Sequence, residues 1–385
     1  MQTEDSIGRL LADPARANEF VAQVDAIGAK YFAMVGKKDL TDIRIKSAIS
    51  KASMLSGRGL IHLGAVTGSI PVVAVGALLF GFHQFMESET LGHDIMHGIY
   101  DKLAPPQSRL TSSRFHQPLA FHERGWQIMH NTHHANCGVI GRDPDIGYGI
   151  LRLNTSVPWT MGHLGMFLFF LITFPFFAIH LSVYSTGVAA HLWEKRTGQR
   201  MLREMTPKIV AENMREFASK STFILAQNLV FFPFLTGDGF WFAVSGYIMA
   251  CVCVSLLLVF TTLTNHTDIQ TRMFSEDEVS THRAFWMAQQ IESSSNINVG
   301  FFGKYFLSTL AFQIEHHLFP KMPAPKLAAI AVEIQSLCLE YGVKYHRGAL
   351  PRLVLESVWR NAYFAIPPVM SAWIGERFPR LRPTG

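Results

Sequence analysis

The sequence has few charged residues and few cysteines for its length. Charged side chains make up 16% of the 385 residues and apolar ones 49%, whereas about 25% charged is usual for a soluble domain. This scarcity of charge argues against an ordinary soluble protein and favours one that lies in a membrane. The cysteines do not suggest a disulfide framework, because Cys251 and Cys253 point in different directions on a helix and Cys137 and Cys338 are isolated. A reducing compartment is therefore expected.

An N-terminal targeting signal and low-complexity linkers are also missing. The opening stretch MQTEDSIGRLLADPARANEF mixes acids and bases and contains no long apolar run. A secretory signal needs an apolar core and a transit peptide is poor in acids, so neither is predicted. We expect the N-terminus to remain in the cytoplasm.

Several apolar runs predict membrane-spanning helices. Residues 57–90 suggest two helices folded back at residues 69–71, with the first limb beginning near Ile45. Residues 217–236 and 239–264 each approach the roughly 20 apolar residues that a bilayer requires. A short TGDG turn separates these two runs. The sequence therefore predicts two transmembrane hairpins with four spans.

Charge predicts which side of the membrane the connections occupy. Residues 191–220 hold seven Lys or Arg, whereas the turn at 236–239 holds one Asp and no base. By the positive-inside rule, the basic segment is cytoplasmic.

Residues 159–190 are also apolar enough to span. A single crossing there would place the histidine-containing segments before and after it on opposite faces, where they could not share a site. Pro175, His163 and His180 suit a helix that lies in the interface or dips and returns. We therefore expect this segment not to cross.

Histidines gather in groups whose spacing suits metal ligands. They form HDIMH at 93–97, HNTHH at 130–134 and QIEHH at 313–317, and one more follows the last apolar run. Helix positions i, i+3 and i+4 share a face, so members of a group can point at one ion. One transition ion takes about four to six ligands, so this many imidazoles suit two ions. The candidates are His93, His97, His130, His133, His134, His266, His316 and His317.

Spacing alone leaves iron, zinc, copper and nickel open. Metal-bound imidazoles usually donate their other N–H to a carboxylate or carbonyl, and Glu315, Asp94, Asp143 and Asp145 are candidates for that role. Gln313 stands where a third histidine would complete an HxxHH repeat, and it could bind weakly, orient a water or only hydrogen-bond. The remaining histidines are interpreted as surface or hydrogen-bonded core residues: His62, His83, His116, His122, His163, His180, His191, His282 and His346.

The boxes HxxxH, HxxHH and QxxHH, with apolar hairpins between them, resemble those of the membrane fatty acyl desaturase family. FQIEHHLFPKMP is similar to the front-end and linoleoyl-type branch, in which Gln replaces the first His of the third box. LGHDIMHG, HHANCGVIGRDPDIG, QQIESSSNI and LCLEYGVKYH extend the likeness from about residue 80 to residue 346. The resemblance implies a di-iron centre that uses O2 and two electrons to remove hydrogens from an acyl chain. By position, its ligands are the eight candidate histidines, with Gln313 beside them.

We accordingly expect an all-α integral membrane protein with interfacial helices and a cytoplasmic helical cap that holds the di-metal site. One desaturase-like domain covers residues 1–385. Within it, residues 1–44 form a cytoplasmic N-terminal segment, 45–264 the membrane core and 265–385 the cap with the third box. The expected location is a bacterial inner membrane, with the active site facing the cytoplasm.

Two further motifs are absent, and their absence bears on the electron supply. No HPGG signature of a fused cytochrome b5 domain occurs, and no GxGxxG follows a strand. Electrons are therefore expected from a separate ferredoxin, cytochrome b5 or reductase. This absence also weakens the assignment to the front-end branch. The expected substrate is a fatty acyl group on coenzyme A, a carrier protein or a lipid. Membrane lipid is an expected partner and nucleic acid is not.

Two alternatives stay open at this point. A di-iron centre of the same superfamily could hydroxylate the acyl chain or form a triple bond, and the boxes do not separate these reactions from desaturation. A histidine-rich membrane transporter or sensor that binds zinc or haem belongs to a different class. It predicts polar residues through the spans, yet residues 239–264 contain no charged residue.

Overall fold

The computed structural model describes residues 5–146 and 152–384, and the described chain is mostly helical. Residues 1–4 of the predicted N-terminal segment and Gly147 of the GRDPDIG stretch lie outside the described residues. Tertiary contacts divide the chain into two compact units. Unit 1 comprises Met1–Gly36, His130–Leu171 and Phe260–Gly385, and unit 2 comprises Lys37–Met129 and Ile172–Val259.

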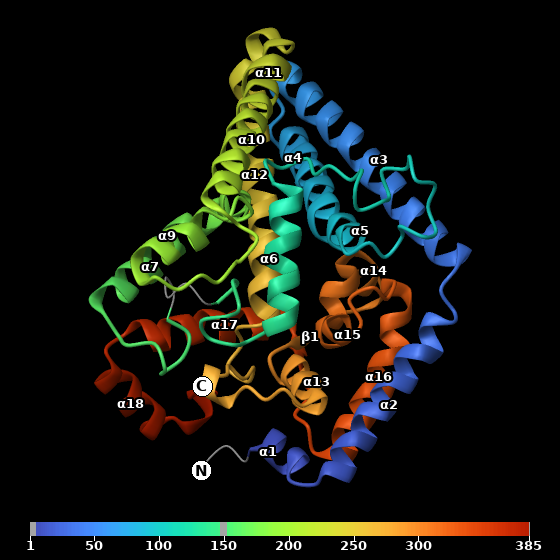
Figure 1. Cartoon of the computed structure of the whole chain (residues 1–385). Coiled ribbons are helices and arrows are strands. Elements are labelled where there is room, and N and C mark those ends of the chain that lie inside the picture. The colour runs from blue at the N-terminus through green and yellow to red at the C-terminus, as the bar shows by residue number, and fades with distance from the viewer. Residues whose placement is uncertain (1–4, 147–151, 385) are drawn as a thin grey trace. The chain divides into compact units, whose positions relative to one another are not determined.

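Unit 2 contains a long helical hairpin. Helices α3 (Lys37–Thr67) and α4 (Ile70–Phe85) pack side by side (Figure 1). The chain reverses at Gly68, whose φ of +67° favours glycine, directly before the predicted turn. Close packing also requires Gly76, because a Cβ atom there would lie 2.5 Å from the backbone nitrogen of Ile61. α3 begins earlier than predicted, because its first turns are polar and hydropathy does not register a polar helix.

Helix α4 leads into a π-helical segment, Met86–His93, and then into α5 (Asp94–Met96). Buried polar contacts tie this segment to α3. Ser50 donates from Oγ to Oε1 of Glu87 at 2.8 Å and lies 2.9 Å from Nδ1 of His83. Arg109 pairs with the other oxygen of Glu87. π-Helical turns are frequent at functional sites, and this one ends at a candidate ligand, His93.

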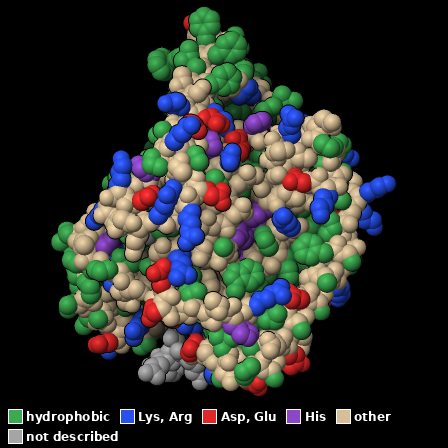
Figure 2. All heavy atoms as spheres, viewed as in Figure 1, with side chains coloured by type: hydrophobic (Ala, Val, Ile, Leu, Met, Phe, Trp, Pro, Cys, Tyr) green, Lys and Arg blue, Asp and Glu red, His purple; other side chains and the backbone are tan. Residues whose placement is uncertain are grey.

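The second predicted hairpin region also lies in unit 2. It comprises α10 (Pro207–Leu225), a π-helical segment (Ala226–Phe231), α11 (Phe232–Phe234), a 3-10 turn at the predicted TGDG sequence, and α12 (Phe240–Thr262). Side chains of α3, α4 and α12 share an apolar cluster, against which Phe232 packs. Figure 2 shows hydrophobic side chains gathered around α11. Phe234 and Trp241 are each 76% exposed there, as lipid-facing side chains are.

Three described helical stretches are long and apolar enough to cross a membrane: Ile70–Met96, Met161–Tyr184 and Gly237–Asn265. Met161–Tyr184 consists of α7 (Met161–Thr173), a 3-10 turn and α8 (Phe177–Tyr184), and α9 (Val188–Thr197) follows. Length and composition do not separate a crossing helix from an interfacial one. The non-crossing expectation for residues 159–190 therefore stays a prediction, as does the count of four spans.

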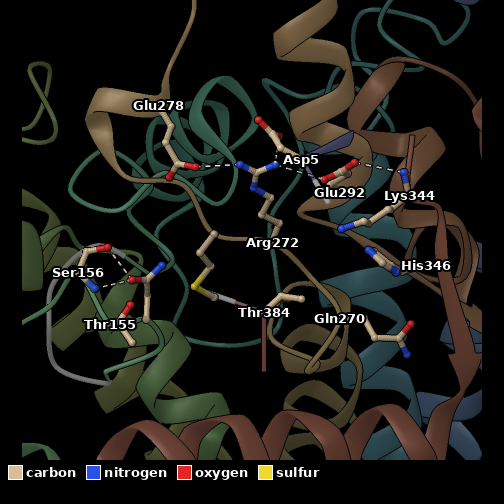
Figure 3. A pocket seen from close by; sticks show the side chains of 12 residues that line it. Asp5, Thr155, Ser156, Gln270, Arg272, Glu278, Glu292, Lys344, His346 and Thr384 are labelled. Carbon is tan, nitrogen blue, oxygen red and sulfur yellow. Dashed lines mark hydrogen bonds and ion pairs between the residues drawn. The ribbon is translucent and has the colours of Figure 1, made fainter. Parts of the chain in front are cut away.

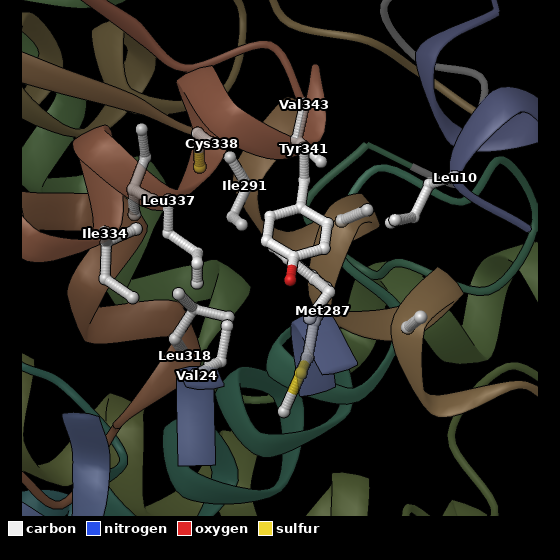
Figure 4. Packing of buried hydrophobic residues seen from close by; sticks show 14 of the residues in the cluster. Leu10, Val24, Met287, Ile291, Leu318, Ile334, Leu337, Cys338, Tyr341 and Val343 are labelled. Atoms are coloured by element: carbon white, nitrogen blue, oxygen red, sulfur yellow. The ribbon is translucent and has the colours of Figure 1, made fainter. Parts of the chain in front are cut away.

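Unit 1 has its core between helices from both ends of the chain. α2 (Pro14–Phe32) packs against α16 (Ala324–Tyr341), and α1 (Ser6–Leu11) packs against α13 (Arg283–Glu292). Figure 4 shows side chains of this core, among them Val24, Ile291, Leu318, Ile334 and Leu337. The remaining helices are α14 (Phe301–Leu307), α15 (Gln313–Leu318), α17 (Leu350–Ala365) and α18 (Pro368–Arg377). This apolar core supports α13 and α15, which carry much of the candidate site.

Two short strands depart from the all-α prediction. β1 (Ser295–Asn298) and β2 (His346–Ala349) pair in parallel, with Ser295 opposite His346. Each strand has four residues, the shortest length over which an alternating pattern can identify a strand in a sequence. The pair fixes the chain directly after α13.

A buried arginine joins the C-terminal helices to the loop after α12. Arg360 of α17 is fully buried and donates hydrogen bonds of 2.6–3.1 Å to the carbonyls of Leu153, Asp268, Thr271 and Thr384. Burial lowers the pKa of this guanidinium to about 10, although the Asp268 carboxylate acts in the opposite direction. The loop thus held begins beside His266, a candidate ligand.

Candidate metal centre

Helix α6 (Glu123–Asn136) carries the histidines of the second box. His130 and His134 stand one turn apart, and their Nε2 atoms are 3.0 Å apart. The ring of His133 lies 5.7 Å, centre to centre, from each of these two rings. Beyond the helix, Gly138 turns the chain with a φ of +77°. Helix geometry thus directs two of the imidazoles together and the third elsewhere.

Helix α15 adds the histidines of the third box. The Nε2 atom of His316 lies 3.2 Å from that of His134. The ligand nitrogens of His130, His134 and His316 all lie within 4.8 Å of one another. We call these three residues the first cluster.

His133, His266 and His317 form the second cluster. Their ring centres are 4.7–5.0 Å apart in each pairing. The amide nitrogen of Gln313 lies 3.0 Å from Nε2 of His266 and 3.2 Å from Nε2 of His317. The Sγ atom of Cys137 also belongs to this group of ligand atoms. The cluster thus unites residues from the second box, the third box and the end of the last apolar stretch.

Oxygen atoms hold the outer nitrogens of the second cluster. Nδ1 of His133 lies 2.9 Å from the carboxylate of Asp143, and Nδ1 of His317 lies 2.9 Å from Oε1 of Gln290. Nδ1 of His266 lies 3.0 Å from the carbonyl oxygen of Ser293. Since an oxygen acceptor requires a proton on Nδ1, each ring presents Nε2 as its acceptor when it is neutral. Such contacts orient metal-binding imidazoles.

Charge and burial act differently on these imidazoles. Burial and the neighbouring imidazoles hold the pKa of His317 well below its ordinary value, so this ring is neutral. Burial also opposes the charged form of His133, but the carboxylates of Asp143 and Asp145 outweigh it and raise the pKa to about 9. Neutral imidazole is the form that binds metals.

Unit 2 holds the first-box pair. The rings of His93 and His97 lie 4.8 Å apart, centre to centre. The ring of Trp126 lies 5.7 Å from His93 and 6.0 Å from His97. Asp94 is fully buried, with Oδ1 3.8 Å from Nδ1 of His93. The pair therefore has the i, i+4 proximity expected from its spacing.

The carboxylates suggested by the sequence take different positions. Asp143 contacts His133 directly, and Asp145 lies 3.4 Å from the same nitrogen. Glu315 instead accepts hydrogen bonds from the side chains of Asn296 and Tyr345, at 2.7 Å and 2.9 Å. Its carboxylate thus braces α15.

Sequence reasoning missed Gln290 and Ser293, which contact His317 and His266. Both residues occur in the QQIESSSNI stretch. The sequence identifies this stretch as part of the family resemblance but does not show that it contacts the histidines. Among the remaining histidines, His83 contacts Ser50, His163 contacts Thr160, and His282 accepts from the backbone at the start of α13. Among the described residues, none of the nine set aside belongs to a group of three metal-binding side chains.

A polar pocket of about 300 Å³ also lies in unit 1. Figure 3 shows Arg272 with its guanidinium directed at acidic side chains, near Lys344 and His346. Arg272 pairs with Asp5 at 3.0 Å and with Glu278 at 2.8 Å. No candidate ligand lines this pocket, so we do not include it in the metal centre.

The donor set fits transition ions. Imidazole nitrogens suit iron, zinc, copper or nickel, whereas calcium and magnesium prefer oxygen ligands. The second cluster adds neutral rings held by oxygen acceptors, which is the usual support of a metal-binding histidine. The fold and the clusters together define a mostly helical membrane protein with a histidine-rich site that is compatible with metal binding.

Comparison with known proteins identifies the family. The profile described as fatty acid desaturase matches residues 69–349, and the chain belongs to this family. It is 26% identical over 343 residues to the NADPH-dependent stearoyl-CoA 9-desaturase of Mycobacterium tuberculosis, covering 87% of this chain and 77% of that protein. It is 25% identical over 288 residues to fatty acid desaturase 3 of Homo sapiens, covering 71% of this chain and 57% of that protein.

Proposed function

We propose that this protein is an O2-dependent fatty acyl desaturase that introduces a double bond into an acyl chain at a histidine-ligated di-iron centre. The observation that carries the proposal is the pair of imidazole clusters, with the second held by Asp143, Gln290 and Ser293, in a chain of the fatty acid desaturase family. Desaturases are oxidoreductases. The nature of the metal, the ligand set and the use of O2 belong to the proposal.

In this proposal, the eight histidines of the first-box pair, the first cluster and the second cluster together hold the two irons. Within unit 2, the side chain of Trp126 packs against the rings of both His93 and His97. Gln313 is a further ligand or an orienting group at the second cluster.

The two irons would supply the oxidation of an unactivated C–H bond, which acid and base side chains cannot achieve. The protein's own contribution is orientation and exclusion of water. His316 and His317 are fully buried, so the reacting centre would be dry. Asp143, Gln290 and Ser293 hold the Nδ1 atoms of the second-cluster rings and so orient these rings. The four spans would enclose the acyl chain.

The substrate is a fatty acyl group whose carrier is coenzyme A, a carrier protein or a lipid. The name of the mycobacterial relative supports an acyl-CoA and a reductant derived from NADPH. Electrons would arrive through a separate ferredoxin, cytochrome b5 or reductase. Gln313 in the third box supports the front-end and linoleoyl-type branch.

The proposed membrane arrangement has two hairpins, α3 with α4 and Pro207–Phe234 with α12, while Met161–Tyr184 lies in the interface. Tags after residue 100, near residue 205 and at the C-terminus should then report the cytoplasm of a bacterial inner membrane, and a tag at Asp238 the opposite side. Opposite faces for residues 145 and 205 would show that the segment between them crosses.

The deciding experiment supplies O2, a reductant and an electron-transfer protein to membranes that contain the enzyme. Mass spectrometry of the acyl pool should find a product two hydrogens lighter than its substrate. A gain of one oxygen would identify a hydroxylase instead, and a loss of four hydrogens an acetylenase. An unchanged acyl pool despite full iron content would remove the central support for a desaturase.

A further inference from the structure

Two amide side chains form a chain of hydrogen bonds that ends on the second cluster. Asn265 precedes a candidate ligand and is 1% exposed, and Gln313 is 3% exposed. The Nδ2 atom of Asn265 donates to Oε1 of Gln313 at 3.2 Å. The Nε2 atom of Gln313 lies at hydrogen-bond distance from Nε2 of both His266 and His317. The amide of Gln313 therefore stands between Asn265 and two imidazoles.

The direction of every hydrogen bond in this chain follows from one carbonyl. The Ser293 carbonyl can only accept, so Nδ1 of His266 carries the proton and Nε2 is an acceptor. Gln313 must then present its NH2 group to the imidazole, which directs its Oε1 toward Asn265. Asn265 must donate in turn, and its own Oδ1 is buried without a hydrogen-bond partner among the described residues. This is the orientation that imidazoles with free Nε2 lone pairs require.

A divalent transition ion at the second cluster would require the opposite orientation of the Gln313 amide. When it takes the Nε2 lone pairs of His266 and His317, the NH2 group of Gln313 loses its acceptors and directs its positive end at a cation. The carbonyl end of the same amide is the favourable neighbour of a cation. With Oε1 toward the ion, the NH2 group faces Asn265 and needs an acceptor there.

We propose that Asn265 and Gln313 form a coupled amide pair whose two side chains turn together when the second cluster binds a divalent transition ion. This inference rests on the proposed metal centre. Asn265 is a positioning residue, because it acts through Gln313 and its amide supplies a donor in one state and an acceptor in the other. Asparagine is suited to both states, whereas a residue that only donates or only accepts is suited to one.

The substitutions at Asn265 have distinct expected effects. Asn265→Asp removes the donor and keeps the acceptors, which destabilises the metal-free orientation and stabilises the loaded one. Asn265→Leu removes one hydrogen bond from each state, so these losses cancel in the binding equilibrium. We expect N265D to bind the ion at least 10-fold more tightly than the wild type and N265L to stay within about threefold.

The experiment measures cobalt(II) binding to the purified metal-free protein by competition with a chromophoric chelator. A double-mutant cycle with Gln313→Leu is the control. If Asn265→Asp acts through the amide of Gln313, its tightening disappears in the Q313L background. If the added charge simply attracts the cation, the tightening persists there, and the coupled pair is refuted.

A second outcome overturns the proposal without the aspartate variant. A loss of 10-fold or more in N265L would mean that Asn265 serves the loaded state only, as a ligand would. Circular dichroism and size-exclusion chromatography exclude misfolded variants. A wild-type protein that binds no cobalt would refute the metal centre itself, whereas normal wild-type binding with an uncoupled cycle refutes the amide pair alone.

Discussion

Replacing Arg360 with Met tests whether this buried arginine holds the loop after α12. The substitution removes a guanidinium that donates to four backbone carbonyls. Hydrogen bonds to a charged group contribute roughly 1.5–3 kcal/mol each, so these four sum to about 6–12 kcal/mol. Against them stands the cost of burying the charge. The fall of the pKa from 12.5 to about 10 corresponds to about 3.4 kcal/mol at 1.36 kcal/mol per unit.

The net expectation for Arg360→Met is a loss of about 3–9 kcal/mol in the free energy of unfolding, because four buried carbonyls are left without their donor. Thermal unfolding of the metal-free protein in detergent measures it, and the midpoint should fall by roughly 10 °C. Arg352→Met is the matched control, because Arg352 lies on the same helix, has a 60% exposed side chain and pairs with Glu356. Its loss should be below about 1 kcal/mol. Equal midpoints for the two variants would refute the reasoning.

Three further substitutions test other parts of the molecule. His317→Ala should lower bound iron and abolish turnover. His180→Ala should leave both the iron content and the turnover unchanged, and a loss of iron in this variant would mean that its helix contributes to the site. Gly76→Ala should destabilise the α3–α4 hairpin by about 1–3 kcal/mol, because its Cβ would meet backbone. Gly59→Ala should not destabilise the hairpin, because no atom lies within 4 Å of the added Cβ. Matching unfolding curves for the Gly76 and Gly59 variants would contradict the packing argument. Burial, aided by the charge of Lys344, lowers the pKa of His346 in the folded protein to about 4. The unfolded chain therefore takes up the proton at a higher pH than the folded protein, and the free energy of unfolding falls as the pH drops from 6.5 to 4. His346→Asn should remove about 2 kcal/mol of that loss at pH 5, and identical pH profiles would count against it.

Helical periodicity and hydropathy were sufficient for part of this fold. The reversal at residues 69–71 was predicted to within a residue or two, since Gly68 and Pro71 interrupt an apolar run. The all-α expectation missed β1 and β2. These strands pair across about 50 residues of sequence, and each has only the shortest length over which a sequence pattern can identify a strand. The early start of α3 was missed because its first turns lie in a polar sequence.

The candidate site was also predictable from the sequence only in part. The spacing of the second box allowed His130 to pair with either His133 or His134, because i+3 and i+4 share a helix face. In the structure its Nε2 meets that of His134, and His133 faces the second cluster. Gln290 could not be assigned to its partner from sequence, because it contacts an imidazole 27 positions away. Local periodicity predicts which residues share a helix face, and tertiary packing selects their partners.

The position of α13 in the chain has a consequence for biosynthesis. Gln290 and Ser293 lie after all three of the described apolar stretches, the last of which ends at Asn265, and His317 is later still. A ribosome therefore makes every one of those stretches before it makes Gln290, Ser293 and His317. Under the proposed metal centre, an ion at the second cluster would gain its full set of contacts only after the last apolar stretch had been synthesised. A chain arrested before residue 290 would contain all three stretches and would still lack His317, so it could not complete that cluster.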